Sequence, residues 1–245
     1  MNKKTASNEC SMALSGFKIF SVIAFGVAII LFIAIASYKA MDTKLSNELS
    51  ALPLPEVSEG MRGTMGIDKN INETTIDNYL GRSDTVYRDM RMLIDDADYK
   101  AIDGDSYLSG IVEGFEVIPL PFLTYPEGLP ETVGNGYSGK TLFSYDKEND
   151  KYVANYKESM QVLEDIFPKD KIIFLMCGGG GYAGMTKNLL VNLGWDKEKI
   201  YNVGGYWYYD GEHKTPIKMT IDGVETYAFW RLNYHNIDFS VLHEA

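Results

Sequence analysis

Hydrophobic residues dominate one continuous stretch near the start of the chain. Residues 19–36 (IFSVIAFGVAIILFIAIA) contain no charged side chain, and Ser37 and Tyr38 extend the uncharged run. A helix of about 20 residues is about 30 Å long, which matches the hydrocarbon core of a bilayer. A core helix that is apolar on every face would be unusual at the edge of a small protein. The pattern therefore predicts a transmembrane helix over residues 17–38, preceded by a short segment over residues 1–16.

The lysines near this run indicate its orientation. Lys3, Lys4 and Lys18 precede the predicted span, whereas Lys39 and Lys44 follow it. Lys and Arg accumulate on the cytoplasmic side of transmembrane helices, so the amino-terminal segment is expected in the cytoplasm. The expected localisation is therefore the cell membrane, crossed once, with an extracytoplasmic body.

A cleavable signal peptide is the alternative to a permanent anchor. Ala34-Ile35-Ala36 is a small-x-small triplet of the kind that a signal peptidase recognises. The apolar run is longer than the h-region of a typical signal peptide, which favours an uncleaved anchor. Cys10 precedes the span and is therefore not the modified cysteine of a lipoprotein signal.

After the predicted span, the pattern is first irregular and then alternates between helix and strand. Residues 39–71 are polar and small, with several prolines and glycines, and predict a juxtamembrane linker. Residues 72–245 have the size of a single domain. The sequence predicts helices over residues 74–80, 158–167 and 185–193, strands over residues 85–89, 115–118, 171–176 and 199–203, and a hairpin over residues 141–156. This alternation is typical of an α/β fold with a parallel central sheet flanked by helices.

Composition and charge narrow the range of partners. The chain has 23 Lys and Arg residues against 34 Asp and Glu residues, and a formal net charge of −11. Nucleic acid is excluded as a partner, because phosphate binding requires a basic surface. The 2 cysteines exclude a disulfide-stapled scaffold. The histidines are too scattered along the sequence to predict a metal site; they are His213, His235 and His243.

A glycine-rich loop follows the most apolar predicted strand. Its sequence is Cys177-Gly178-Gly179-Gly180-Gly181-Tyr182-Ala183-Gly184. Ligands of open parallel sheets bind beyond the carboxyl ends of the strands, and successive glycines let backbone N–H groups converge on a small anion. The start of the following helix adds positive potential. Cys177 is therefore expected to be a nucleophilic thiolate with a depressed pKa, the alternative being a small buried residue before a flexible turn.

The order of these elements resembles that of the rhodanese-like sulfurtransferases. The family has a cysteine-led loop after a buried strand, then a helix, a glycine, a strand and a Gly-Gly pair near a tryptophan. This chain has the loop, a predicted helix to Leu193, then Gly194-Trp195, the strand 200–203 and Gly204-Gly205-Tyr206-Trp207. Asp89-Met90-Arg91 resembles the Asp-x-Arg of the family. Residues 110–119 resemble the stretch that leads to its second core strand, without the usual histidine.

The resemblance covers residues 74–209 and implies a reaction. A small donor would place a sulfane sulfur on Cys177, and a thiol acceptor would remove it, without a metal or an organic cofactor. The implied substrate-binding residues are Gly178, Gly179, Gly180, Gly181, Tyr182 and Arg91, where Arg91 is equally consistent with a structural pair to Asp89.

The loop departs from the family pattern at two positions. Tyr182 stands where sulfurtransferases commonly carry a basic residue, so binding of a dianion such as thiosulfate is expected to be weak. For a neutral, polysulfide-like or protein-borne persulfide donor, the missing basic residue would weaken binding less. Ala183 stands where related phosphatases and arsenate reductases carry arginine, which disfavours phosphoryl chemistry.

The leading interpretation is thus a membrane-anchored, rhodanese-like sulfurtransferase that uses Cys177. The alternative is a catalytically weak rhodanese-like module that binds a ligand or a protein at the membrane surface. A redox or arsenate-handling protein ranks last, because the body has no second cysteine to resolve a disulfide.

Overall fold

The computed structural model describes residues 31–45, 53–58, 60–62, 66–95, 99–125 and 139–245. The chain divides into two compact units, residues 1–51 and 52–245. In the first unit, residues 31–45 form a helix with exposed side chains. Within the described parts of the chain, no helix is both long and apolar enough to cross a membrane. Most of the predicted span over residues 17–38 lies outside the described residues, so it stays a prediction.

A parallel sheet of four strands forms the centre of the second unit. The strand order is β3 (Glu116–Val117), β1 (Thr85–Asp89), β6 (Ile172–Cys177) and β7 (Ile200–Gly205). β6 lies between β1 and β7 and is almost completely buried, as its continuous apolar sequence predicts for a strand covered on both faces. The predicted α/β class and parallel sheet are confirmed.

Alternate residues of β6 face two separate cores. Ile173, Leu175 and Cys177 belong to the core that contains the buried residues of the helices, whereas Phe174 and Met176 belong to the other. This division follows from the two-residue period of a strand. It places the Cys177 side chain on the helical face of the sheet.

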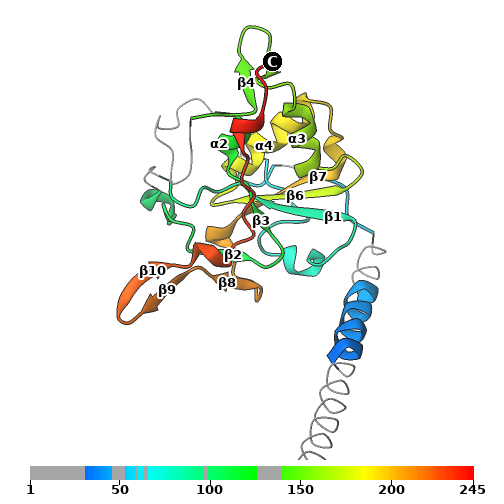
Figure 1. Cartoon of the computed structure of the whole chain (residues 1–245), viewed down its shortest axis with the longest axis vertical. Coiled ribbons are helices and arrows are strands. Elements are labelled where there is room, and N and C mark those ends of the chain that lie inside the picture. Colours follow the sequence, from blue (N-terminus) through cyan, green and yellow to red (C-terminus); the bar gives the residue numbers. More distant parts are fainter. Residues whose placement is uncertain (1–30, 46–52, 59, 63–65, 96–98, 126–138) are drawn as a thin grey trace, which may run out of the picture. The chain divides into compact units, whose positions relative to one another are not determined.

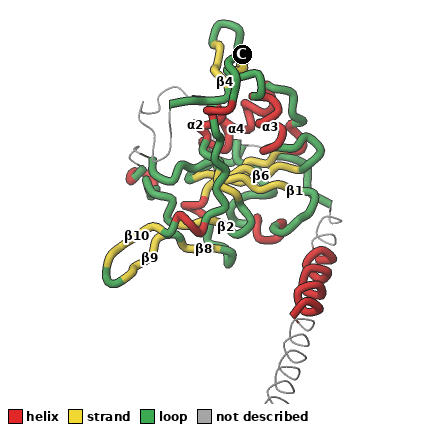
Figure 2. Tube along the Cα trace, viewed as in Figure 1, coloured by secondary structure: helices red, strands yellow, loops and turns green. Residues whose placement is uncertain are grey.

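The two faces of the sheet are covered differently. The helices α2 (Leu120–Leu123), α3 (Ser159–Ile166) and α4 (Gly181–Asn192) gather on one face, above the sheet in Figure 1. Short strands and loops lie below it, as the yellow and green segments of Figure 2 show. The α-helices thus gather on one face of the sheet, whereas the sequence predicts helices on both. On the other face, residues of short irregular segments pack against Phe174 and Met176.

The remaining elements are short. Three two-stranded sheets pair β2 (Gly110–Val112) with β8 (Lys214–Pro216), β4 (Phe143–Asp146) with β5 (Lys151–Ala154), and β9 (Lys218–Ile221) with β10 (Val224–Tyr227). The 3₁₀ helices are η2 (Ile76–Tyr79), η3 (Lys100–Ile102), η4 (Lys197–Lys199), η5 (Tyr206–Tyr208), η6 (Phe229–Arg231) and η7 (Phe239–Val241). The predicted hairpin is β4–β5, and the helix expected over residues 74–80 is the 3₁₀ helix η2. α4 starts four residues before the predicted start, at Gly181.

Part of the expected linker belongs to the folded body. The sequence pattern predicts that the domain starts at residue 72, whereas the compact unit starts at Leu52. Ile67, Asp68 and Ile71 are completely buried. The Asp68 carboxylate accepts hydrogen bonds from the backbone N–H groups of Asn70 and Ile71, at 2.7 Å each. A segment held by such local side-chain bonds has no hydrophobic period, so the pattern resembled a linker.

Candidate functional site

A cavity of about 100 Å³ lies beyond the carboxyl ends of the central strands. β1 and β6 pair in register up to Asp89 and Met176, so the segments that follow them start at the same edge of the sheet. The cavity is lined by Arg91, Met92, Asp95, Tyr99, Ile102, Asp105, Ser106, Tyr107, Leu108, Cys177, Gly178, Gly179, Gly181, Tyr182 and Trp207. This is the place where open parallel sheets bind their ligands.

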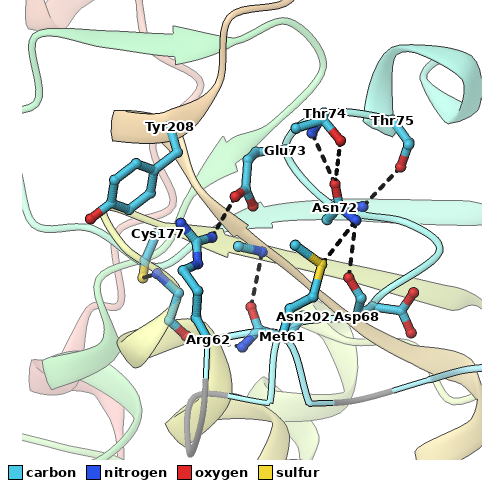
Figure 3. A network of polar contacts seen from close by, with 12 residues as sticks. Met61, Arg62, Asp68, Asn72, Glu73, Thr74, Thr75, Cys177, Asn202 and Tyr208 are labelled. Carbon is cyan, nitrogen blue, oxygen red and sulfur yellow. Dashed lines mark hydrogen bonds and ion pairs between the residues drawn. The ribbon is translucent and has the colours of Figure 1, made fainter.

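Cys177 is part of the cavity wall although its side chain is nearly inaccessible. It ends β6 with 3% of its surface exposed. The backbone N–H of Gly180 donates a hydrogen bond to Sγ at 3.0 Å, the contact between Cys177 and the loop in Figure 3. The backbone N–H groups of Tyr182 and Ala183 also lower the pKa of the thiol. The loop therefore directs main-chain donors at the sulfur, as the glycine pattern predicts.

The expected depression of the pKa is nevertheless wrong. Burial raises the pKa of the Cys177 thiol, and the negative charge of Asp89 raises it further. The backbone donors of the loop act in the opposite direction and do not compensate. Because removal from water disfavours the ionised form, the sulfur is a thiol at neutral pH.

The pH dependence of alkylation tests this correction. A raised pKa means that the thiolate appears only at higher pH, so the iodoacetamide reaction of Cys177 should reach half its maximal rate above the pH found for a free cysteine. The measurement uses the Cys10→Ser variant, with glutathione as the reference thiol. A midpoint below that of glutathione would contradict the burial argument and restore the original expectation.

The glycines near the sulfur have different roles. A Cβ at Gly178 would overlap the indole ring of Trp207, and a Cβ at Gly205 would overlap the backbone oxygen of Gly178. Gly180 has a φ of +98°, and its Cβ would lie 2.6 Å from Ile67 Cδ1. A Cβ at Gly181 would meet nothing within 4 Å. Three of these four positions therefore require glycine, either for close approach or for a positive φ.

Asn202 holds the glycine loop in place through hydrogen bonds from the neighbouring strand β7. This completely buried residue of β7 donates from Nδ2 to the Gly180 carbonyl at 3.0 Å. Its Oδ1 accepts the N–H of Gly204 at 3.1 Å, and its carbonyl accepts the N–H of Asp68 at 2.8 Å. Figure 3 shows this network around Asn202. The same side chain thus joins β7 to the glycine that bonds Sγ.

A second part of the network holds the segment before η2. Arg62 pairs with the buried Glu73 at 2.5 Å and lies over the Tyr208 ring, 4.3 Å from its centroid. Asn72 Oδ1 accepts bonds from the N–H and the hydroxyl of Thr74. These contacts explain why residues 66–74 are ordered against the sheet without being helical or extended.

Replacing Asn202 by alanine should destabilise the body. The Gly204 N–H would lose its partner in a buried position, which costs about 1–3 kcal/mol of unfolding free energy. Urea denaturation followed by far-UV circular dichroism measures this change. The matched control is Asn188→Ala on the exposed side of α4, which should change stability by less than about 0.5 kcal/mol. Equal midpoints for both variants would contradict the role given to Asn202.

Two tyrosines and an aspartate form a hydrogen-bonded triangle in the wall. The hydroxyls of Tyr99 and Tyr182 donate to Asp95 Oδ2 at 2.6 Å and 2.7 Å, and the two hydroxyl oxygens are 2.9 Å apart. Burial raises the pKa of both tyrosines, and Asp95 raises it further. Tyr182 thus occupies the position of the expected basic residue, but its hydroxyl is directed at a carboxylate.

Arg91 has both roles that its sequence position suggested. Its guanidinium pairs with Asp89, with Nε 2.9 Å from Oδ1, and Nη2 donates to the Gly110 carbonyl at 2.8 Å. The residue also lines the cavity. Among the described residues, Nη1 has no hydrogen-bond partner, and the same holds for Nε1 of Trp207. Buried donors without a partner are rare and mark places where a ligand or water accepts a bond.

The charge of the wall disfavours a strongly anionic ligand. Among the described lining residues Arg91 is the cation, and Asp89 already pairs with it, whereas Asp95 and Asp105 add two carboxylates. Met92, Leu108 and Trp207 supply apolar surface. A compact, polarisable and uncharged ligand therefore fits the wall better than a dianion.

The structure brings all the predicted site residues together. Cys177, Gly178, Gly179, Gly181, Tyr182 and Arg91 line the cavity, and Gly180 bonds the sulfur. Sequence reasoning missed Asp95 and Tyr99, which follow β1, although the shared edge of β1 and β6 is a signal for them. The histidines lie elsewhere, each beside a glutamate: His213 by Glu113, His235 by Glu116 and His243 by Glu158.

Comparison with known proteins adds no relative. The chain has no significant match among protein-family models, curated proteins or solved structures. The site must therefore be interpreted from its own geometry.

Proposed function

We propose that this chain is a rhodanese-like sulfurtransferase that carries a sulfane sulfur as a persulfide on Cys177. The observation that carries the proposal is the position of Cys177: it ends the central parallel strand, lines a cavity and accepts the Gly180 N–H at 3.0 Å. A main-chain donor in this position stabilises negative charge on Sγ, which develops when the thiol ionises for attack and again when the acceptor removes the outer sulfur.

The proposed reaction has two balanced steps. The Cys177 sulfur attacks the outer sulfur of a donor R–S–SH, the bond between the two donor sulfurs breaks, and R–SH leaves. An acceptor thiol then attacks the outer sulfur of the persulfide, takes it and restores the Cys177 thiol. No net oxidation occurs, because each step breaks one sulfur–sulfur bond and forms another. The sulfane sulfur therefore keeps its oxidation state throughout. The proposed partners are thus a small sulfur donor and a thiol acceptor.

The rhodanese-like assignment rests on the order of the elements. A buried parallel strand, the loop from Cys177, a helix, the next parallel strand and Gly204-Gly205 follow one another as in that family. Asp89 and Arg91 stand at the end of the neighbouring strand. The tether over residues 17–38 and an extracytoplasmic position of the body are part of the same proposal and rest on the sequence.

A catalytically weak binding module is the second candidate. It is favoured by the raised pKa of the thiol and by the missing cation at Tyr182, both of which slow a nucleophilic attack. Such a module would hold a small sulfur species in the cavity without transferring it.

Incubation with different donors separates the two candidates. The full-length chain in detergent is treated with glutathione persulfide, inorganic polysulfide or thiosulfate, and its intact mass is measured. The sulfurtransferase gains the mass of one sulfur from glutathione persulfide, and much less from thiosulfate and inorganic polysulfide, because the wall disfavours these small anions. No gain from any donor would reject the proposed function.

A further inference from the structure

The triangle of Asp95, Tyr99 and Tyr182 lies in the same cavity as the thiol. All three side chains line the 100 Å³ space together with Cys177. Asp95 is 6% exposed, so its carboxylate is removed from bulk water. A buried carboxylate that lines the same cavity as a thiol is a candidate to exchange a proton with it.

The hydrogen bonds of the triangle leave room for one additional proton. Its three oxygen–oxygen contacts of 2.6, 2.7 and 2.9 Å are all within hydrogen-bond distance. With Asp95 ionised, two hydroxyl protons serve three contacts. One additional proton on Asp95 provides a donor for each contact and closes a ring. Since burial raises the pKa of both tyrosines, they keep their protons and the carboxylate is the group that accepts one.

The thiol needs such an acceptor. Burial and Asp89 hold Cys177 in its protonated form, whereas only the thiolate attacks a sulfur–sulfur bond. The backbone N–H of Tyr182 lowers the pKa of the Cys177 thiol, and an ionised Cys177 would raise the pKa of Tyr99, so the triangle and the sulfur influence each other's charge within the cavity. The other charged groups of the wall are Arg91, which pairs with Asp89, and Asp105.

We propose that Asp95, held by Tyr99 and Tyr182, accepts the proton of the Cys177 thiol during attack and returns it to the leaving thiolate. The donor is then a hydropersulfide in its neutral form, R–S–SH, since the described lining residues include the carboxylates of Asp95 and Asp105 and a single cation, Arg91, which pairs with Asp89. The inference rests on the proposed sulfur transfer. Atoms and charge balance: the thiol loses a proton to Asp95, the outer sulfur moves to Cys177, and R–S⁻ takes the proton from Asp95.

The pH profile of sulfur uptake tests this role. Uptake from glutathione persulfide is followed by quenched mass spectrometry on the full-length chain between neutral and alkaline pH. Asp95→Asn should slow uptake about 100-fold at neutral pH. The deficit should shrink at alkaline pH, where the thiolate forms without a base. Asp103→Asn is the control, because it removes one exposed carboxylate outside the cavity and asparagine tolerates the φ of 55° at this position.

Two outcomes overturn the inference while the proposed function stands. If Asp95→Asn takes up sulfur at the wild-type rate with the wild-type pH profile, the triangle does not move a proton. If it reacts faster, Asp95 only holds the thiol protonated. Tyr182→Phe, which removes one corner of the ring, should show a smaller deficit with the same recovery, and it decides the matter if Asp95→Asn does not fold. No uptake by the wild type would reject both the transfer and the inference.

Discussion

Cys177→Ser should lose sulfur uptake completely and keep the fold. The serine hydroxyl occupies nearly the same volume and can accept the Gly180 N–H that now bonds Sγ at 3.0 Å. Stability should therefore change by about 1 kcal/mol, whereas a hydroxyl forms no persulfide. Intact mass after incubation with glutathione persulfide, together with a urea denaturation curve, measures both effects.

The control for this prediction is the other cysteine. Cys10→Ser should take up one sulfur as the wild type does, because Cys10 precedes the predicted span and lies far from the loop in the sequence. If Cys177→Ser still gains a sulfur and Cys10→Ser does not, the persulfide site has been assigned to the wrong residue.

The second large effect is expected from a single methyl group at Gly205. A Cβ at this position would overlap the backbone oxygen and carbon of Gly178, and a backbone cannot turn away as a flexible side chain does. β7 pairs with β6 through Gly205 and Cys177, so the overlap pushes the strand away from the loop. Gly205→Ala should lower the unfolding free energy by about 3 kcal/mol. It should also abolish uptake at temperatures where the protein remains folded.

The matched control is another glycine of the same region. Gly181 begins α4, and a Cβ there meets nothing within 4 Å. Gly181→Ala should leave stability unchanged or raise it by up to about 1 kcal/mol, because alanine favours the helix. Chemical denaturation of the two variants in parallel gives the comparison. If Gly181→Ala lost as much unfolding free energy as Gly205→Ala, the close approach of Gly205 to Gly178 would not be the cause of the destabilisation.

The sheet could be predicted from the sequence because its signals are local. Residues 171–176 are continuously apolar, and they form the buried strand β6. The coverage of the second face could not be predicted in this way. Ile71, which belongs to the core of that face, lies in a segment without a period, whose order depends on the Asp68 carboxylate and on the distant Asn202. Such contacts join residues far apart in the sequence and leave no pattern in it.

The site was predictable in its position and less so in its electrostatics. The glycines identify the loop that directs N–H groups at Cys177, and the structure has this arrangement. The direction of the Cys177 pKa shift depends on burial and on the charge of Asp89, which raise it, and on the backbone donors of the loop, which lower it. The sequence does not show which of these opposing effects is larger. Asp95 and Tyr99 reach the cavity only because β1 and β6 are neighbours in the sheet.

The most direct test of the account is the location and release of the sulfur. The full-length chain is loaded with glutathione persulfide, digested, and the peptide that contains Cys177 is analysed by tandem mass spectrometry before and after treatment with cyanide. The account predicts one additional sulfur on Cys177 that cyanide removes as an equal amount of thiocyanate. An unmodified Cys177 in the loaded protein, or a sulfur that cyanide does not remove, would contradict it.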